Sequence, residues 1–386
     1  MKKLTIVYHY FAHYREPVIR ELCHHLSADF KVELMADETA DVLGLQTIPM
    51  SEFTAGLCEF RRLKNIWLGP WLWQLGLLGG IIRGRSDVVI FLGQFNFLST
   101  WIAVIVARLM GKKTYFWSHG LYGNEGKLKR VIRVSFYKLA DGMLLYGNYA
   151  RELLIDAGLD PSHLHVIYNS LDYKPQKRFR DQKEESSVSG IRRELFGLDS
   201  PYIIFVGRLT AVKRLDLLLS GLSEINYHLK RDVRCLIVGD GPEVHNLQLQ
   251  SKAEGVEGLV KFYGECHDEE TLSDLIYAAD ACVAPGNVGL TAMHSLVYGT
   301  PVITHDDKSW QMPEFEAIVP GVNGDFFIKG SLRDLTDKIC EWLDCIATDR
   351  SVIRAACYEI IDQKYNPMHQ AKVIKSVIKG EEASFL

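Results

Sequence analysis

The sequence is short of the features that mark secreted, metal-bound or dinucleotide-binding chains. None of its eight cysteines forms a Cys-x-x-Cys pair, and several lie in apolar runs such as RCLIVG, which favours reduced core thiols in a cytoplasmic protein. The opening MKKLTIVYHYF predicts a strand rather than a secretory signal. No Asp-x-Asp motif offers a metal site, and no Gly-x-Gly-x-x-Gly follows the first apolar run.

Length and charge indicate two unlike halves. At 386 residues the chain exceeds one ordinary core, so two domains are expected. Residues 1–170 hold 19 Lys and Arg against 15 Asp and Glu, whereas the remainder holds 25 against 33, and five of the seven tryptophans lie in the first part. A weakly basic, Trp-rich half suits an anionic surface or acceptor better than nucleic acid, which calls for a stronger basic bias.

Short apolar runs alternate with amphipathic stretches in the first half, which predicts parallel strands joined by helices. The expected strands are 4–8, 31–35, 87–93, 113–119, 142–147 and 165–169, and the expected helices are 15–28, 70–83, 97–110, 127–140 and 148–157. Residues 171–190 are polar and aperiodic, which predicts a linker. The pattern restarts with strands at 202–207, 234–239, 259–264, 281–285 and 301–304.

We therefore expect an N-terminal domain over 1–170 and a C-terminal domain over 191–365, with a helix in 366–386 that returns to the first domain. Both are doubly wound α/β domains, a design that places ligands at the carboxyl ends of its strands.

The uncharged stretch NIWLGPWLWQLGLLGGII, residues 65–82, reaches the lower limit for a membrane span. Its Gly69-Pro70 and Gly79-Gly80 pairs favour a buried or interface-lying helix instead. In the segment KLKRVIRVSFYK, residues 127–138, an apolar stripe lies opposite four basic residues. The basic side is either a solvated helix face or a contact for an anionic lipid acceptor.

The stretch FVGRLTAVKRLDLLL carries the strongest chemical signal in the second half. A buried strand ends at Gly207, Arg208 follows at its tip, and Lys213 is expected at the start of the next helix. Helix starts carry free N–H groups and partial positive charge, so two cations at such a place suit a diphosphate. Two solvated charges are the alternative that this pair alone leaves open.

Five motifs in the second half resemble, in their order along the chain, the second domain of the retaining nucleotide-sugar glycosyltransferases of family four. They are the stretch just described, then LIVGDGPE, VKFYGECHDEETLSDLIYAAD, APGNVGLTAMHSLVYGTPVIT and PEFEAIVPGVNGDFF. The resemblance implies the GT-B fold, in which two Rossmann-like domains face each other across a cleft. It also implies transfer of a sugar from a UDP- or GDP-sugar to an acceptor hydroxyl, with retention and without a metal or other cofactor.

The resemblance assigns roles to particular residues. The implied catalytic residues are His119, Arg208 and Lys213. The implied donor-binding residues are Gly207, Phe262, Tyr263, Gly264, Gly286, Asn287, Val288, Gly289, Leu290 and His294. The implied acceptor-binding residues, after the first strand, are Tyr10, His13, Tyr14 and Arg15. A histidine and aromatics at these N-terminal positions also suit simple packing.

The sequence departs from the family at two positions. Family members usually carry two glutamates seven residues apart, and here those positions are Gly286 and His294. A neutral imidazole can accept one ribose hydroxyl bond in place of the second glutamate. Because Leu290, Met293 and Val297 share its stripe, His294 also suits a core position. Loss of the loop glutamate indicates altered donor choice, or an inactive relative.

The expected role is bacterial cell-surface polysaccharide or glycolipid assembly, by a cytoplasmic enzyme that is peripheral on the inner face of the plasma membrane. Expected partners are the nucleotide-sugar and a glycan or lipid-linked acceptor. A nucleotide-sugar epimerase needs acid and base carboxylates in the cleft, and a phosphorylase needs a pyridoxal-phosphate lysine; neither is identified. A catalytically inactive GT-B module remains the other alternative.

Overall fold

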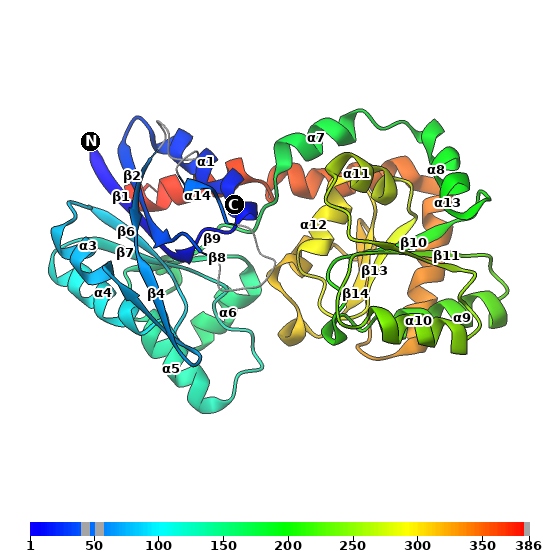
Figure 1. Ribbon diagram of the computed structural model, residues 1–386, viewed down its shortest axis with the longest axis horizontal. Coiled ribbons are helices and arrows are strands. Elements are labelled where there is room, and N and C mark those ends of the chain that lie inside the picture. Colours follow the sequence, from blue (N-terminus) through cyan, green and yellow to red (C-terminus); the bar gives the residue numbers. More distant parts are fainter. Residues whose placement is uncertain (40–46, 51–57, 382–386) are drawn as a thin grey trace. The chain divides into compact units, whose positions relative to one another are not determined.

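A computed structural model of the chain describes residues 1–39, 47–50 and 58–381 (Figure 1). Contacts divide it into two units, residues 1–171 with 366–386 and residues 172–365. Each unit is described on its own below.

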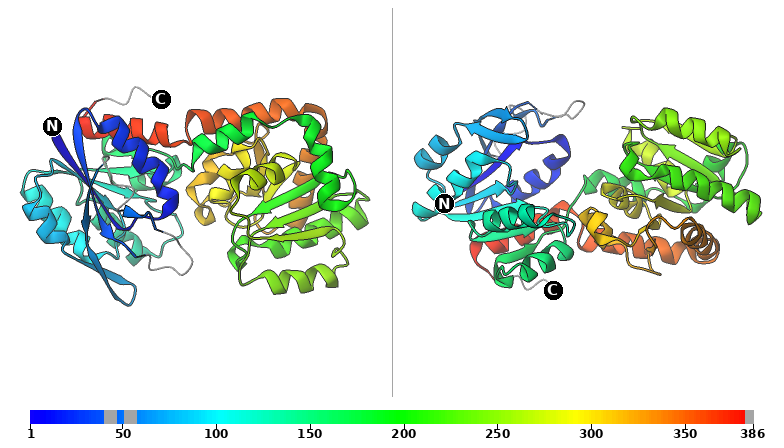
Figure 2. Two further views of the ribbon diagram at one scale, coloured as in Figure 1. Left: turned by 45° about the horizontal axis from the view of Figure 1, so that its top comes forward. Right: turned by 90° about the horizontal axis from the view of Figure 1, so that it is seen from below.

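Unit 1 is built on a seven-stranded sheet of order β3-β2-β1-β6-β7-β8-β9, in which every neighbouring pair is parallel. The strands are β1 (Lys2–Tyr10), β2 (Phe30–Asp37), β3 (Glu59–Arg62), β6 (Val88–Leu92), β7 (Lys113–Ser118), β8 (Gly142–Leu145) and β9 (Leu164–Val166). The helices are α1 (Glu16–Leu26), α3 (Leu77–Arg83), α4 (Leu98–Leu109), α5 (Lys127–Tyr137), α6 (Asn148–Asp156) and α14 (Pro367–Lys379). Helix α14 joins the core beside α1, so the chain's end belongs to the first unit (Figure 2).

Unit 2 is built on a six-stranded parallel sheet of order β12-β11-β10-β13-β14-β15. The strands are β10 (Tyr202–Val206), β11 (Arg234–Val238), β12 (Val260–Gly264), β13 (Ala281–Ala284), β14 (Val302–His305) and β15 (Gly324–Phe327). The helices are α7 (Tyr173–Asp181), α8 (Val188–Phe196), α9 (Leu215–Ser223), α10 (Val244–Ala253), α11 (Glu269–Tyr277), α12 (Leu290–Val297) and α13 (Leu332–Gln363), the last interrupted at Asp349. Its apolar strands are buried on both faces, as the continuous apolar runs predict.

The predicted helix at 70–83 is wrong. An antiparallel hairpin, β4 (Lys64–Leu68) and β5 (Trp71–Leu75), turns at Gly69-Pro70, and only the residues after Gly76 form helix α3. The left-handed φ of Gly69 (60°) and Gly76 (90°) explains both boundaries, because L side chains rarely adopt it. Because residues 64–75 form this hairpin, the alternative of a helical span at 65–82 is also wrong. Within the described ranges no helix is long and apolar enough to cross a bilayer.

The predicted linker at 171–190 is not a structureless segment. It contains helix α7, a short turn at Glu185–Ser187 and the start of α8. Arg180 on α7 is buried and donates to both carboxylate oxygens of Asp362 on α13, at 2.8 and 3.0 Å. Some charged side chains of this segment therefore anchor it to the rest of unit 2 through ion pairs. The amino-acid composition of the segment does not predict such pairing.

Candidate functional site

The carboxyl end of β10 is followed by an exposed cation with no partner among the residues that the structure describes. The strand ends at Val206, whose carbonyl accepts a hydrogen bond of 2.7 Å from the Thr291 hydroxyl on α12. The next residue, Gly207, donates a backbone hydrogen bond of 3.0 Å to the carbonyl of Val238 on β11. The next side chain, Arg208, is exposed and makes no ion pair or side-chain hydrogen bond with any part of the chain that the structure describes. Its guanidinium is therefore available to an external anion.

Lys213 is held at the same end of the sheet. Its Nζ donates to the backbone oxygen of Asn287 at 2.7 Å and to the side-chain oxygen of Asn287 at 2.8 Å. An ammonium has three N–H donors, so one is left for a ligand. Burial lowers the pKa of Lys213 to about 8, and the nearby carboxylate of Glu314, itself 2% exposed, partly opposes the shift. Lys213 is thus a fixed donor whose charge depends on its surroundings.

The predicted position of Lys213 at a helix start needs correction. The residue closes a 3-10 turn, Ala211–Lys213, and helix α9 begins at Leu215. Between them Arg214 adopts a left-handed conformation with φ of 51°. Because this conformation cannot continue a right-handed helix, the lysine lies in the loop before α9 and not on the helix.

The N-terminus of α12 lies beside the lysine. Gly289, the residue before the helix, has φ of 54°, and a Cβ placed there would lie 3.8 Å from Lys213 Nζ. In the described chain the backbone N–H groups of Leu290 and Thr291 have no acceptor, as expected for a first helical turn. The partial positive charge of a helix start, added to the lysine, makes this a place that favours phosphate oxygens.

The loop before α12 explains why a family glutamate is missing at Gly286. The Gly286 amide donates to Lys213 O at 2.9 Å, and a Cβ on this residue would lie 1.9 Å from the backbone oxygen of Val212. That contact is far inside van der Waals distance. The loop therefore approaches the Lys213 turn so closely that no side chain, glutamate included, fits at position 286.

Two of the loop amides expected to face the donor are used internally. The Gly286 amide is bonded to Lys213, and the Val288 amide donates to the side-chain oxygen of Gln311 at 2.9 Å. Of the other implied donor-binding residues, Phe262 and Tyr263 lie on β12, where Phe262 is half-buried and Tyr263 is 38% exposed. The Gly264 carbonyl accepts from Gly239 at 2.7 Å, which ties the ends of β12 and β11 together.

His294 lies on α12 in a mixed environment. Met293 and Val297 are 2% and 1% exposed, and His294, on the same stripe, is somewhat more exposed than these two neighbours. Its Nδ1 is buried and has no hydrogen-bond partner in the described residues. Burial lowers the pKa of His294, and the Glu269 carboxylate opposes this, so the ring is neutral near pH 7.

Glu269, at the start of α11, is fixed by two other donors. It accepts from the Tyr298 hydroxyl at 2.6 Å and from the Gln176 amide at 3.0 Å. A neutral imidazole beside a fixed carboxylate fits both a hydroxyl contact and a structural position, and the two interpretations of His294 stay open.

In unit 1, His119 directly follows β7. Burial lowers its pKa to about 3, and the positive charges of Arg15 and Arg133 add to the effect. The Nδ1 atom is buried without a partner in the described chain, and the ring lies 4.6 Å from that of Tyr146. Gly120 turns the chain with φ of 69°, and its carbonyl accepts from the Tyr137 hydroxyl at 3.2 Å. His119 is therefore a neutral imidazole in a rigid turn.

The predicted acceptor residues differ in their surroundings. The Arg15 guanidinium lies 5.1 Å from the centre of the Tyr146 ring, the ring that His119 also contacts. Tyr10 is 7% exposed and packs on its neighbour His9, so it is a core residue. His13 and Tyr14 face solvent. Arg15 therefore lies in one cluster with His119, and Tyr14 borders that cluster, since the Arg15 guanidinium lies 5.4 Å from the centre of the Tyr14 ring.

Three features escaped sequence reasoning. Glu314 stands in the quoted PEFEA segment, but nothing in the sequence showed that its carboxylate would face Lys213. Asn287 was expected to present a backbone amide, and its oxygens hold the lysine instead. Gln311 braces the same loop by donating to Thr304 and to the His305 carbonyl, both at 2.9 Å. Such contacts depend on loop conformation, for which spacing gives no signal.

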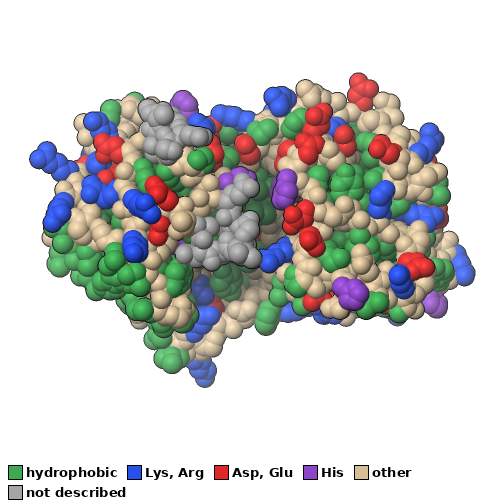
Figure 3. All heavy atoms as spheres, viewed as in Figure 1, with side chains coloured by type: hydrophobic (Ala, Val, Ile, Leu, Met, Phe, Trp, Pro, Cys, Tyr) green, Lys and Arg blue, Asp and Glu red, His purple; other side chains and the backbone are tan. Residues whose placement is uncertain are grey.

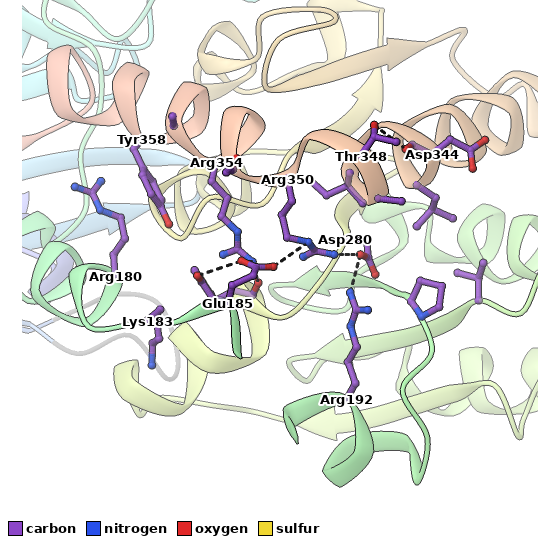
Figure 4. Close-up of a pocket in the computed structure, with 18 of the residues that line it drawn as sticks. Arg180, Lys183, Glu185, Arg192, Asp280, Asp344, Thr348, Arg350, Arg354 and Tyr358 are labelled. Atoms are coloured by element: carbon purple, nitrogen blue, oxygen red, sulfur yellow. Dashed lines mark hydrogen bonds and ion pairs between the residues drawn. The ribbon is translucent and has the colours of Figure 1, made fainter. Parts of the chain in front are cut away.

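A cavity of about 1070 Å³ in unit 2 lies at the opposite edge of the sheet, next to the residues that precede β10, β11 and β13 (Figure 4). Its arginines are matched by carboxylates: Arg192 pairs with Asp280 at 2.6 Å, and Arg350 and Arg354 each pair with Glu185 at 3.2 Å. This network joins the 171–190 segment to α13, and its matched charges give it a structural role.

Two family models match this chain, one on each half. The family model described as Glycosyltransferase Family 4 matches residues 16–174, and the model described as Glycosyl transferases group 1 matches residues 191–357. Mannosylfructose-phosphate synthase from Agrobacterium fabrum is 29% identical over 161 residues, 39% of this chain and 34% of the relative. Alpha-D-kanosaminyltransferase from Streptomyces kanamyceticus is 25% identical over 173 residues, 44% of this chain and 43% of the relative. The chain thus spans less than half the length of these curated relatives.

Solved structures resemble the whole chain. The Anabaena protein HepE in complex with UDP has a TM-score of 0.73 at 17% identity, covering 98% of this chain and 100% of that one. A glycosyltransferase from Rickettsia africae has a TM-score of 0.74 at 14% identity, with 98% of each chain covered. These likenesses show the GT-B fold. With one family model on each half, the chain belongs to the group 1 glycosyltransferases of family four.

Proposed function

We propose that the protein transfers a sugar from a nucleoside-diphosphate sugar to an acceptor hydroxyl. The observation that carries the proposal is the arrangement around Lys213: an oriented ammonium, the open amides of α12 beside it, and the exposed Arg208 after β10. As the glycosidic bond breaks, negative charge develops on the departing diphosphate, and donors fixed in advance stabilise that charge. Structures with this fold hold UDP and UDP-glucose, which supports a UDP-sugar, with a GDP-sugar as the alternative donor.

The proposed reaction retains the configuration of the sugar and uses no metal. Arg208, Lys213 and the helix start supply the positive charge that a metal supplies to the diphosphate elsewhere. In a front-face reaction the departing phosphate takes the acceptor's proton, so no protein base is needed. This agrees with the cations and open amides at the proposed diphosphate position, where the nearby Glu314 carboxylate is buried against Lys213. His119, neutral at pH 7, is proposed to donate a hydrogen bond to a sugar hydroxyl.

The proposed acceptor is a glycan or a lipid-linked glycan, and the proposed location is peripheral, on the inner face of the plasma membrane. Among the relatives, alpha-monoglucosyldiacylglycerol synthase from Streptococcus pneumoniae, 25% identical over 201 residues, is named for a lipid product. A role in bacterial cell-surface polysaccharide or glycolipid assembly agrees with such an acceptor.

The test is donor binding and turnover with a panel of UDP- and GDP-sugars. Arg208→Ala or Lys213→Ala should each weaken binding of the matching nucleoside diphosphate by about 1.5–3 kcal/mol, since each removes a charge-assisted bond. Lys252→Ala, an exposed cation on α10 of the same unit, is the control and should bind normally. Normal turnover in either site variant would contradict the diphosphate assignment. Tight UDP or GDP binding without hydrolysis or transfer would instead indicate the inactive module.

A further inference from the structure

Helix α4 presents its larger apolar side chains to solvent. Toward the sheet it buries Ser99, Thr100, Ala103, Val104 and Ala107. Outward it exposes Leu98, Ile102, Ile105 and Leu109 by 37, 43, 44 and 84%. A helix that covers a sheet normally buries its large apolar residues and exposes its small or polar ones. The reversed order here indicates that the outer face of α4 has a second apolar partner.

Neighbouring elements extend this exposed apolar area. The exposed residues are Trp67, Leu68, Trp71 and Leu75 on the β4–β5 hairpin, Ile82 on α3, and Leu128 and Val131 on α5. Contacts join the elements into one surface: the Leu72 amide donates to Asn96 O at 3.0 Å before α4, and Trp101 on α4 packs 4.9 Å from Phe136 on α5. Figure 3 shows the apolar side chains gathered over this part of unit 1. We call these residues, with those of α4, the α4 surface.

The charge around the α4 surface is mostly positive. Residues 64–141, which contain it, hold eleven Lys and Arg and three acids, Asp87, Glu125 and Asp141. Glu125 pairs with Arg133 at 2.9 Å, Asp141 pairs with Arg108 on α4 at 3.4 Å, and Asp87 accepts the Lys3 amide at 2.7 Å. Exposed cations lie on or directly after α3 and α5, beside the apolar residues of these helices: Arg83, Arg85, Lys127, Lys129 and Lys138.

Apolar area bordered by lysine and arginine, with tryptophans among it, is the surface that enters the interface of an anionic bilayer. Large exposed apolar patches of this kind mark interaction sites in soluble proteins. An acidic protein partner would account for the cations but would leave the aliphatic face of α4 without a partner. We therefore propose that the α4 surface docks unit 1 onto membranes that contain anionic lipid, with the hairpin and α4 inserted among the headgroups. This inference rests on the proposed peripheral location and names the surface responsible.

The test measures binding to vesicles with a triple variant, Ile102→Ser, Ile105→Ser and Leu109→Ser. Exposed side chains were chosen so that the core stays intact, which the thermal unfolding temperature checks. Wild type should sediment with phosphatidylglycerol-rich vesicles and remain soluble with phosphatidylcholine alone. The triple variant should lose at least tenfold in partitioning, and a Lys127→Glu, Lys129→Glu variant should lose binding most strongly at low salt. Ile328→Ser with Val352→Ser, at exposed apolar positions of unit 2, is the control and should bind as wild type does.

Tryptophan fluorescence reports on the orientation. Wild type should be quenched by brominated lipid, and Trp67→Phe with Trp71→Phe should remove most of that quenching. The proposal would be overturned if the wild-type protein did not bind anionic vesicles, or if the triple variant bound them as the wild type does. So would a concentration-dependent dimer that the triple variant abolishes while vesicles have no effect. UDP binding measured without lipid should be unchanged in every variant, which separates failure of docking from failure of the proposed enzyme activity.

Discussion

At the residue scale, Lys213 makes nucleotide binding sensitive to alkaline pH. Its free pKa of about 8 reflects burial, and a bound diphosphate would favour the charged amine, so binding takes up a proton above pH 8. The phosphate groups are already ionised there, since their second pKa is near 6. UDP affinity should therefore fall as pH rises through 8, by at most about tenfold per pH unit. Calorimetric titrations at pH 7, 8 and 9 check this, and Lys213→Arg should bind with little change over that range.

Gly286 is the residue where restoring the family's usual carboxylate should do harm. Gly286→Glu, and even Gly286→Ala, places a Cβ 1.9 Å from Val212 O and forces the loop away from the Lys213 turn. We expect a stability loss of roughly 1–3 kcal/mol, typical of overpacking, together with weaker UDP binding. Gly258→Ala is a matched control, because a Cβ there meets no atom within 4 Å. A Gly286→Glu protein with normal unfolding temperature and UDP affinity would show that the loop has another conformation.

Two substitutions at His294 distinguish a contact with the ribose from a purely structural position in the core. Gln keeps a hydrogen-bond acceptor at this place, and Leu keeps only the bulk. If the imidazole bonds a ribose hydroxyl, Leu should weaken UDP binding by about 0.5–1.5 kcal/mol and Gln by less. Equal affinities for the two variants, with unchanged unfolding temperature for Leu, would assign the histidine to the core.

The sequence could predict only those site residues that directly follow a strand or directly precede a helix, because their place in space follows from their place in the chain. The sequence places Arg208 and Lys213 after β10 and Gly289 before α12, and these meet in the structure at one end of the sheet. Glu314 and Asn287 join them through loop conformation, which depends on the close approach at Gly286 rather than on any local pattern. The roles themselves remain predictions until ligands are bound.

At the element scale, buried strands were predicted well because their continuous apolar runs have few alternatives in a parallel sheet. The hairpin at 64–75 was missed because its residues are apolar on both faces, which hides the alternation of a strand. Edge strands β3 and β15 were missed for a different reason. They are four residues each and partly polar, EFRR and GDFF, so they are too short for a periodic signal.

A carboxylate of α13, Asp362, helps to hold helix α7 in place. Asp362 accepts from Arg180 at two oxygens and from the Tyr173 hydroxyl at 2.8 Å. Asp362→Ala leaves the buried guanidinium without this partner, and we expect unit 2 to lose about 1.5–3 kcal/mol of stability. Asp337→Ala, an exposed ion pair on the same helix, should change it by less than about 0.5 kcal/mol. Chemical denaturation followed by circular dichroism compares the two, and equal losses would contradict the anchoring role.

At the scale of the whole molecule, repetition is what made the fold predictable. Two runs of strands and helices imply two parallel sheets, and the structure contains them in orders 3-2-1-6-7-8-9 and 12-11-10-13-14-15. The chain passes into the second unit at Asp172 and returns at Asn366, and both crossings lie in polar sequence that resembles an ordinary loop.

Buried neutral histidines should make the folded chain sensitive to mild acid. Burial lowers the pKa of His9 to about 4 and that of His119 to about 3, whereas both titrate near 6.5 when unfolded. Below pH 6.5 the unfolded chain therefore binds more protons than the folded one, and the free energy of unfolding falls as pH falls toward 4. Urea titrations at pH 7.5, 6.5 and 5.5 measure that slope, in a range where most carboxylates stay ionised. His119→Gln should flatten the slope even if it lowers stability at pH 7.5. A slope as steep as in wild type would mean that His119 accepts its proton while folded, and hence that its site is wetter than the structure shows.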